Sequence, residues 1–218
     1  MEDGDLYRFL VQAAANVGGK LVCIAEGRTP WDVFFEERFL GNSRVDPCSR
    51  ILKRQFMDAW LTANCDPADT VCYVGIDWTE EHRFTGLRER KAAAGWRYEA
   101  PLCEAPFISK DQLELWMEVE GLRSPRLYGL GFHHNNCGGF CVKAGQGHFA
   151  NLLRKLPARY AEHEAKEEAI RLVLGDVSIM RDRSGGEHKT LTMKQFRERI
   201  EAKQKVDEDE IGGCGCVA

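Results

Sequence analysis

The stretch Thr70-Val71-Cys72-Tyr73-Val74-Gly75-Ile76 leads directly into Asp77-Trp78-Thr79-Glu80-Glu81-His82-Arg83. The first segment is apolar and rich in β-branched and aromatic residues, which predicts a buried strand. The second is a polar cluster that opens a helix, and Gly95 ends that helix. Ligands of open α/β sheets gather at the carboxyl ends of strands, so four residues become site candidates: Asp77, Glu80, His82 and Arg83. A helix cap by Thr79 with solvated charges is the competing interpretation.

The segments on both sides alternate between helices and short apolar runs. Upstream, the pattern predicts helices over residues 5–17, after Thr29-Pro30 and from residue 46, and a strand covered on both faces at residues 21–25. Downstream, it predicts an extended segment at 98–101, helices from residues 109, 146, 157 and 190, and a strand at 177–180. The alternation favours an α/β fold in which helices cover both faces of a parallel sheet.

Composition bounds the class of protein. The chain has 218 residues, of which 44% are hydrophobic, enough for one domain with a substantial core. A net charge of −4 gives no general basic surface, so nonspecific nucleic-acid binding is not favoured. Nine cysteines without a secreted framework or a leader indicate reduced thiols and a cytoplasmic protein. No apolar run approaches the ~20 residues that a membrane-spanning helix needs.

The stretch Gly131-Phe132-His133-His134-Asn135-Asn136-Cys137-Gly138-Gly139-Phe140-Cys141 carries an unusual density of reactive side chains. Because Gly138-Gly139 lets the backbone fold back, the sulfurs of Cys137 and Cys141 can point at one centre. Two thiols cannot complete a metal site. The candidate partners are Cys48, His133 or His134, Cys214 and Cys216. The competing interpretation is a glycine-rich turn with two reduced cysteines beside polar histidines.

Cys48 lies near the predicted start of a helix, where the macrodipole favours a thiolate. The same helix carries Arg50, Lys53 and Arg54 in its first two turns. A positive helix end with three cations suits an anion such as phosphate or sulfate. A solvated basic face is the alternative.

The order of these motifs resembles the phosphoadenosine phosphosulfate (PAPS) reductase family. The similarity rests on a helix-opening Pro-Cys-Ser, a strand ending in Gly-Ile-Asp, and Ser-Pro-Arg-Leu-Tyr ahead of the cysteine pair. That family belongs to the adenine nucleotide alpha hydrolase group, with the N-type ATP pyrophosphatases and the iron–sulfur sulfurtransferases. The resemblance implies a Rossmann-like domain over residues 1–156, a helical extension over 157–206 and a flexible cysteine-containing tail over 207–218.

Carried over by position, Cys48, Cys137 and Cys141 match cysteines that hold a four-iron, four-sulfur cluster in family members. The family commonly has C-x2-C where this chain has one extra residue, and two adjacent cysteines where this chain has Pro47-Cys48. A fourth ligand could be a non-cysteine group, Cys214 or Cys216, and zinc is the alternative metal. Four residues match nucleotide-binding positions or the strand edge beside them: Arg50, Lys53, Asp77 and Arg83.

The chain departs from the family in lacking the phosphate-binding Ser-Gly-Gly-x-Asp-Ser loop and the strand before it. The resemblance therefore implies a domain that is incomplete at its N-terminus. The expected activity is adenine-nucleotide-dependent sulfur chemistry, either reduction of a phosphosulfate or ATP-dependent sulfur transfer. In the reductase version, Cys214 or Cys216 is the nucleophile and a thiol reductant such as thioredoxin a partner. In the sulfurtransferase version, nucleic acid is an acceptor. The non-enzymatic alternative is a zinc or iron–sulfur binding module that has lost nucleotide turnover.

Overall fold

The computed structural model describes residues 2–42, 45–182 and 189–212. Two compact units divide the chain. Among the described residues, unit 1 combines those up to 52 with those of 124–212, and unit 2 comprises residues 53–123. This division differs from the boundaries expected at residues 156 and 206, because the C-terminal helices share the core of unit 1 with an N-terminal helix.

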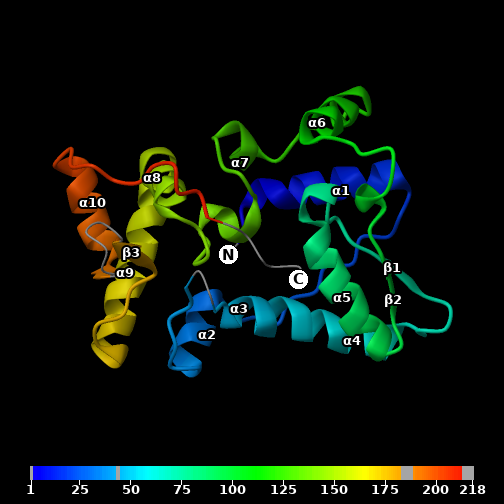
Figure 1. Cartoon of the computed structure of the whole chain (residues 1–218), viewed down its shortest axis with the longest axis horizontal. Helices are drawn as coiled ribbons and strands as arrows, with labels where there is room; N and C mark the ends of the chain where they lie inside the picture. The colour runs from blue at the N-terminus through cyan, green and yellow to red at the C-terminus, as the bar shows by residue number, and fades with distance from the viewer. Residues whose placement is uncertain (1, 43–44, 183–188, 213–218) are drawn as a thin grey trace. The chain divides into compact units, whose positions relative to one another are not determined.

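Unit 1 is mainly helical and contains one small hairpin (Figure 1). Its elements are α1 (Gly4–Val17), α2 (Pro30–Glu36), α3 (Pro47–Ser49), α7 (Arg126–Gly129), η4 (Asn136–Gly139), α8 (Gln146–Lys155), α9 (Pro157–Leu174), β3 (Met180–Asp182), β4 (Lys189–Leu191) and α10 (Met193–Glu201). Strands β3 and β4 pair antiparallel, with Met180 opposite Leu191. The π-helical segment η1 (Arg50–Gln55) contains the division between the units.

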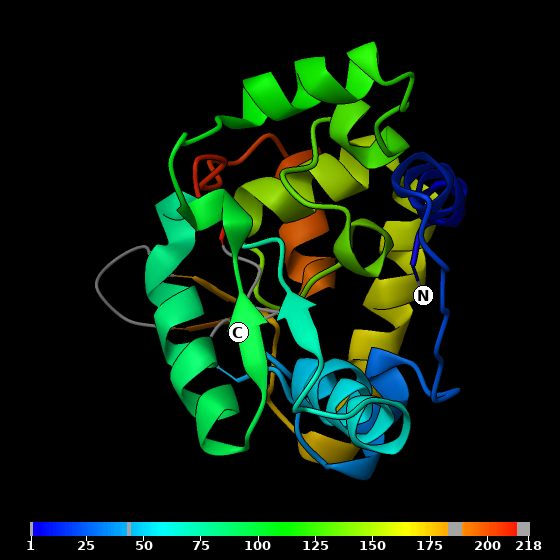
Figure 2. The same ribbon diagram turned by 90° about the vertical axis from the view of Figure 1, so that its right-hand side faces the viewer.

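Unit 2 holds the parallel part of the fold (Figure 2). Its elements are α4 (Phe56–Asn64), β1 (Val71–Tyr73), η2 (Trp78–Glu80), α5 (Glu81–Ala93), β2 (Arg97–Glu99), η3 (Pro101–Cys103) and α6 (Lys110–Val119). Strands β1 and β2 are parallel, with Cys72 opposite Tyr98, and α5 connects them. A separate core lies under this βαβ unit and includes Leu61, Ile76, Phe84 and Leu87.

Local capping chemistry explains where several helices begin. Three helices begin with a capping box, at Thr29, Ser109 and Thr192. In each, the hydroxyl of the cap residue accepts the backbone N–H of the third residue after it, and the side chain of that third residue accepts the backbone N–H of the cap residue. Asp3 caps α1, and Gly18 ends it at a φ of 74°, a left-handed conformation that suits glycine. The helices expected at residues 5–17, 30, 109 and 190 are therefore confirmed.

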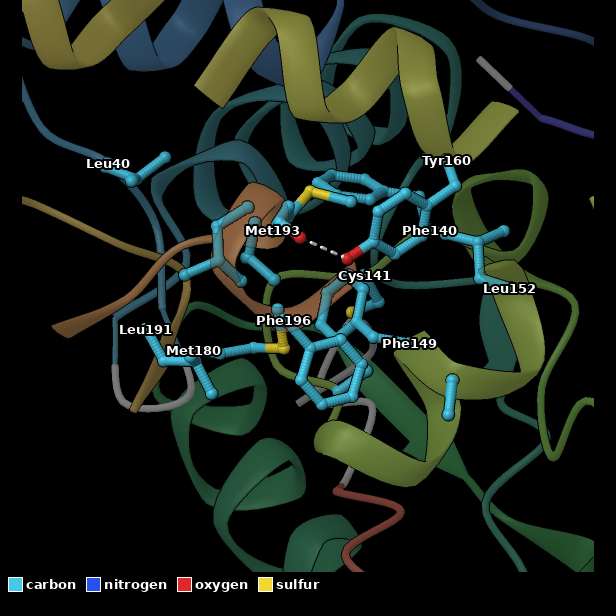
Figure 3. Close-up of a cluster of buried hydrophobic side chains, with 14 of the residues drawn as sticks. Leu40, Phe140, Cys141, Phe149, Leu152, Tyr160, Met180, Leu191, Met193 and Phe196 are labelled. Atoms are coloured by element: carbon cyan, nitrogen blue, oxygen red, sulfur yellow. Dashed lines mark hydrogen bonds between the residues drawn. The ribbon is translucent and has the colours of Figure 1, made fainter. Parts of the chain in front are cut away.

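The core of unit 1 gathers side chains from distant parts of the sequence (Figure 3). Phe149 and Leu152 of α8, Tyr160 of α9 and Phe196 of α10 are fully buried there. The Tyr160 hydroxyl donates to the Met193 carbonyl oxygen at 2.7 Å, so this buried polar group is satisfied. Each fully buried aromatic or leucine side chain contributes about 1.5–3 kcal/mol of transfer free energy, which makes this cluster the main support of the unit.

A buried carboxylate ties three elements of unit 1 together. Glu167 of α9 is fully buried. Its side chain accepts hydrogen bonds from the backbone N–H of Ile179 at 3.0 Å and of Met193 at 2.5 Å. Because Met193 is the first residue of α10, Glu167 satisfies one of the donors that a helix N-terminus leaves open.

The sheet is smaller than expected. The α/β class is confirmed, but the described residues form only a two-stranded parallel sheet and the separate β3–β4 hairpin. The strand expected at residues 21–25 is wrong. No described segment pairs with this run, and Leu21 and Val22 are 39% and 45% exposed. An apolar, β-prone sequence makes a strand only when a neighbour accepts its backbone hydrogen bonds.

Two boundaries on the C-terminal side also differ from expectation. Strand β3 begins at Met180, where the predicted strand ends, and α10 ends at Glu201 instead of near residue 205. Within the part of the chain that the structure describes, no helix combines the length and the apolar character needed to span a membrane.

Candidate functional site

Cys48 and Cys141 belong to one hydrophobic cluster in unit 1. Cys141 is 5% exposed and is a member of the cluster. Cys48, on α3, is partly buried and packs against the same cluster. The residues beside them also meet, because Lys143 Nζ lies 3.9 Å from the carboxylate of Asp46. Two thiols far apart in the sequence are thus brought to a common core.

Cys137 begins a left-handed turn that folds the chain back toward Cys141. The φ angles of Cys137, Gly138 and Gly139 are 51°, 62° and 85°. The Phe140 N–H donates to the Cys137 carbonyl at 3.0 Å and closes the turn. A Cβ atom on Gly139 would lie 3.0 Å from the Phe132 ring, so glycine suits both the conformation and the space. Gly138 and Gly139 therefore adopt the left-handed conformation that the prediction required, and the convergence of the two sulfurs stays a prediction.

Two side chains fix the carbonyl groups of this turn. The guanidinium of Arg159, on α9, donates to the Gly138 carbonyl. The Nε2 atom of His148, on α8, lies 2.8 Å from the Gly139 carbonyl oxygen and donates to it. Arg159 also donates to the buried Asp3 carboxylate at 3.1 Å. Contacts from two helices and from the cap of α1 therefore hold the backbone between the two cysteines.

Phe140, next to Cys141, packs against a hydrogen-bonded pair of aromatic rings, His163 and Trp31. Its ring stacks on His163 with centroids 3.7 Å apart and an interplanar angle of 12°. The Trp31 ring lies 5.6 Å from Phe140 and 6.1 Å from His163, and both pairs are stacked. Burial lowers the pKa of His163 to about 3, so this ring is neutral at physiological pH.

A second imidazole pair lies beside the turn. The rings of His134 and His148 stack with centroids 4.8 Å apart, and Phe132 meets His148 edge-on. Burial, with a further contribution from the charge of His134, lowers the pKa of His148 to about 4. His148 is therefore neutral at pH 7. His133, in contrast, is exposed.

Among residues 2–42, 45–182 and 189–212, no three His, Cys, Asp or Glu side chains are arranged as ligands of one metal ion. Cys48 and Cys141 thus share one core, but the described residues do not form a coordination shell around Cys48, Cys137 and Cys141. Asn135, only 7% exposed, has a side-chain amide whose oxygen and nitrogen find no hydrogen-bond partner in these ranges. Buried polar groups normally have partners, so this amide is an exception next to the cysteine turn.

The segment before the C-terminal tail packs along the start of α8. Ala144 and Gly212 form an antiparallel bridge. Gly145 N–H donates to the Ile211 carbonyl at 2.8 Å, and Gly147 N–H to the Glu210 carbonyl at 2.9 Å. The mobile linker expected from residue 207 therefore does not fit residues 207–212, which are hydrogen-bonded. Cys214 and Cys216 lie outside the described residues.

The expected nucleotide-binding residues have local partners. Asp77 follows β1 and caps η2 by accepting the Thr79 N–H at 2.8 Å, so the cap is Asp77 and not Thr79. Arg83 pairs with Glu80 on the same helical segment. Arg50, in unit 1, pairs with Glu37 at 3.1 Å. Lys53 is partly buried in η1 and belongs to unit 2.

Sequence patterns gave no sign of the residues that hold the cysteine turn. His148 and Arg159 lie in ordinary helical patterns, and Asp3 is recognisable only as a helix cap. Their roles depend on which helices meet, and no local motif encodes that.

Comparison with known protein families, with curated proteins and with solved structures finds no match to this chain.

Proposed function

We propose that unit 1 holds an iron–sulfur cluster or another metal centre through Cys48, Cys137 and Cys141, and that this centre serves adenine-nucleotide-dependent sulfur chemistry. The observation that carries the proposal is the common hydrophobic cluster to which Cys48 and Cys141 both belong. A left-handed turn at Cys137 and Gly138 lies just before Cys141 and supports the proposal that both thiols serve one centre. Thiolates are the preferred ligands of zinc and iron–sulfur centres.

The chain's own residues suit such a centre in part. Arg159 and His148 fix the Gly138 and Gly139 carbonyls, and the apolar side chains around Cys141 limit access of water. A bound cluster would supply thiolate-ligated iron for electron transfer or sulfide delivery. The donor set on the described residues is incomplete, since no three ligands converge there. Binding therefore requires the Cys137 turn or Cys48 to adjust, or a further ligand.

The tail can supply that ligand or a nucleophile. Gly212 pairs with Ala144, three residues after Cys141. Cys214 and Cys216 follow Gly212 in the sequence. Either thiol could coordinate the centre, or attack the sulfur of a phosphosulfate and displace the adenine nucleotide. A dithiol such as thioredoxin would then release the bound sulfur as sulfite and itself become a disulfide.

A second candidate function is a non-catalytic zinc or iron–sulfur module. It is favoured by the local pairing of Asp77 with Thr79 and of Arg83 with Glu80, which leaves these residues in structural roles. In this version the centre stabilises unit 1 and no nucleotide is turned over.

Anaerobic reconstitution with iron and sulfide tests the proposal. We expect a brown protein with broad absorption near ~400 nm, and near-complete loss of iron in Cys48→Ser, Cys137→Ser and Cys141→Ser. The iron content should be unchanged in three control variants, Cys23→Ala, Cys72→Ala and Cys103→Ala. Equal iron loss in all six would mean that folding, not ligation, is being measured. Zinc binding without iron, and no turnover of ATP or a phosphosulfate, would select the non-catalytic module.

A further inference from the structure

A groove of about 530 Å³ in unit 2 runs between α5 and β2. Phe84, Arg88 and Ala92 line one wall, and their spacing of four residues places them on one face of α5. The other wall is formed by the four consecutive residues 97–100. Side chains of a strand alternate between two faces, so four consecutive residues can line one groove only along the strand's edge.

The backbone pattern shows which edge this is. Val74 N–H donates to the Glu99 carbonyl, so the main chain of Glu99 faces β1. Because successive residues of a strand turn their main-chain groups to opposite sides, the N–H and carbonyl of Tyr98 face away from β1. No backbone partner for either group is found in the described ranges. In Figure 2, α5 lies on the side of β2 away from β1, so the groove combines an open strand edge with a helix wall.

The charged residues of the lining are two arginines, Arg88 and Arg97, and two glutamates, Glu99 and Glu104. Arg97 Nε donates to the Glu99 carboxylate at 2.8 Å, and these two charges offset each other. The guanidinium carbon of Arg88 lies 5.4 Å from the centre of the Phe84 ring, a cation–π contact. Glu104 is exposed at another part of the lining. An acidic side chain of a segment that entered this groove could pair with the Arg88 guanidinium.

We propose that the edge of β2 binds an extended peptide segment of a partner protein, which adds as a third strand and directs an acidic side chain to Arg88. Backbone hydrogen bonds to Tyr98 provide the register, and the apolar and aromatic wall, with Phe84 and Trp96, receives the neighbouring side chains. This site lies wholly in unit 2, and it does not depend on the cysteine centre proposed for unit 1.

A defined probe tests this site in the full chain. The probe is a blocked seven-residue peptide of alternating valine and threonine with one central aspartate. Titration should slow hydrogen exchange at the Tyr98 amide, measured by NMR. Arg88→Glu should weaken binding about tenfold, because it replaces attraction by repulsion. Arg90→Glu, on the same helix but outside the groove, should bind as the unmodified chain does.

Two further measurements can overturn the proposal. A peptide with lysine in place of the aspartate should bind less tightly, and one with methylated backbone nitrogens should not bind. Unchanged Tyr98 exchange at millimolar peptide refutes strand addition. Benzoate that shifts the Arg88 and Phe84 resonances, while the peptide shifts none, would identify a small-molecule pocket and also reject the proposal.

Discussion

Trp31 Nε1 donates a hydrogen bond to Nδ1 of His163 at 2.9 Å inside the core of unit 1. The bond fixes His163 as the neutral tautomer that carries its proton on Nε2. It also fixes the ring on which Phe140 stacks, and Phe140 precedes Cys141 directly. A polar contact between two helices, α2 and α9, therefore determines the position of a candidate ligand on a third segment.

Trp31→Phe should destabilise unit 1 by about 1–3 kcal/mol, because the buried Nδ1 atom of His163 loses its donor while the aromatic stack is largely kept. Denaturant unfolding measures the change. Trp116→Phe is the matched control, since Trp116 is 55% exposed, and it should cost less than about 0.5 kcal/mol. Equal losses in the two variants would show that the Trp31–His163 bond contributes nothing specific.

The buried His148 should make the protein less stable in mild acid. Its pKa is lowered to about 4 by burial, whereas an unfolded histidine titrates near 6.5. Between these two pKa values the unfolded state binds a proton that the folded state does not bind. The free energy of unfolding therefore falls as the pH drops below 6.5. We expect a loss of about 2 kcal/mol between pH 7 and pH 5 from this residue.

His148→Gln can still donate to Gly139 and should flatten that part of the pH dependence. His82→Gln, at an exposed position, should leave the slope unchanged. Unfolding curves at pH 7, 6 and 5 give the comparison. Because burial also lowers the pKa of His163, part of the slope should remain in His148→Gln. A slope as steep as that of the unmodified protein would assign the acid sensitivity to groups other than His148.

Local signals in the sequence were sufficient for the helices. Thr29-Pro30, Ser109 and Thr192 each carry their capping partner within three residues, so the pattern alone places the helix start. The reversal at Gly138-Gly139 is also local, since two glycines permit a positive φ. These features need no knowledge of what packs against them.

Non-local features could not be predicted in this way. Residues 21–25 have the composition of a buried strand, yet strand formation depends on a neighbour that the described chain does not provide. The contacts of Arg159 with Gly138 and of His148 with Gly139 depend on helix packing. Among the proposed ligands, the spacing of Cys137 and Cys141 suggested a site, but only the fold shows Cys48 and Cys141 on one core.

Glu167 should give a pH dependence of the opposite sign. Burial raises its pKa to about 7, from 4.5, although two backbone N–H groups partly offset the shift. The folded state therefore favours the protonated form, and its contribution to stability is lost as pH rises through 7. The free energy of unfolding of the unmodified protein, relative to that of Glu167→Gln, should therefore fall by about 2–3 kcal/mol between pH 5 and pH 8. Glu162→Gln, exposed on the same helix, should show no such change.

Gly147→Ala should release the segment at residues 207–212. A Cβ atom there would lie 2.0 Å from the Glu208 carbonyl oxygen, which is backbone and cannot rotate away. We expect faster hydrogen exchange at the Asp207 amide, which donates to Gln146 at 3.2 Å, and faster proteolysis of this segment. Gly4→Ala is the control, because nothing lies within 4 Å of its added Cβ. Unchanged exchange in Gly147→Ala would mean that the backbone accommodates the methyl group.

Asp3→Asn should weaken both the cap of α1 and the support of the cysteine turn. The buried carboxylate accepts from Arg126 at 2.7 Å and from Arg159 at 3.1 Å, and the bond to Arg126 is the main reason that its pKa falls to about 2. The stabilisation is therefore present above pH 3.8 and is lost as pH falls toward 2. At pH 7 we expect Asp3→Asn to cost on the order of 2 kcal/mol.

The same variant reports on the turn itself. Arg159 donates to both Asp3 and Gly138, so loss of the carboxylate should loosen the Gly138 carbonyl and speed alkylation of Cys137. Asp69→Asn, at an exposed position in unit 2, is the control for both measurements and should change neither. If Asp3→Asn lowers stability but leaves the alkylation rate of Cys137 unchanged, Arg159 holds the turn without help from Asp3.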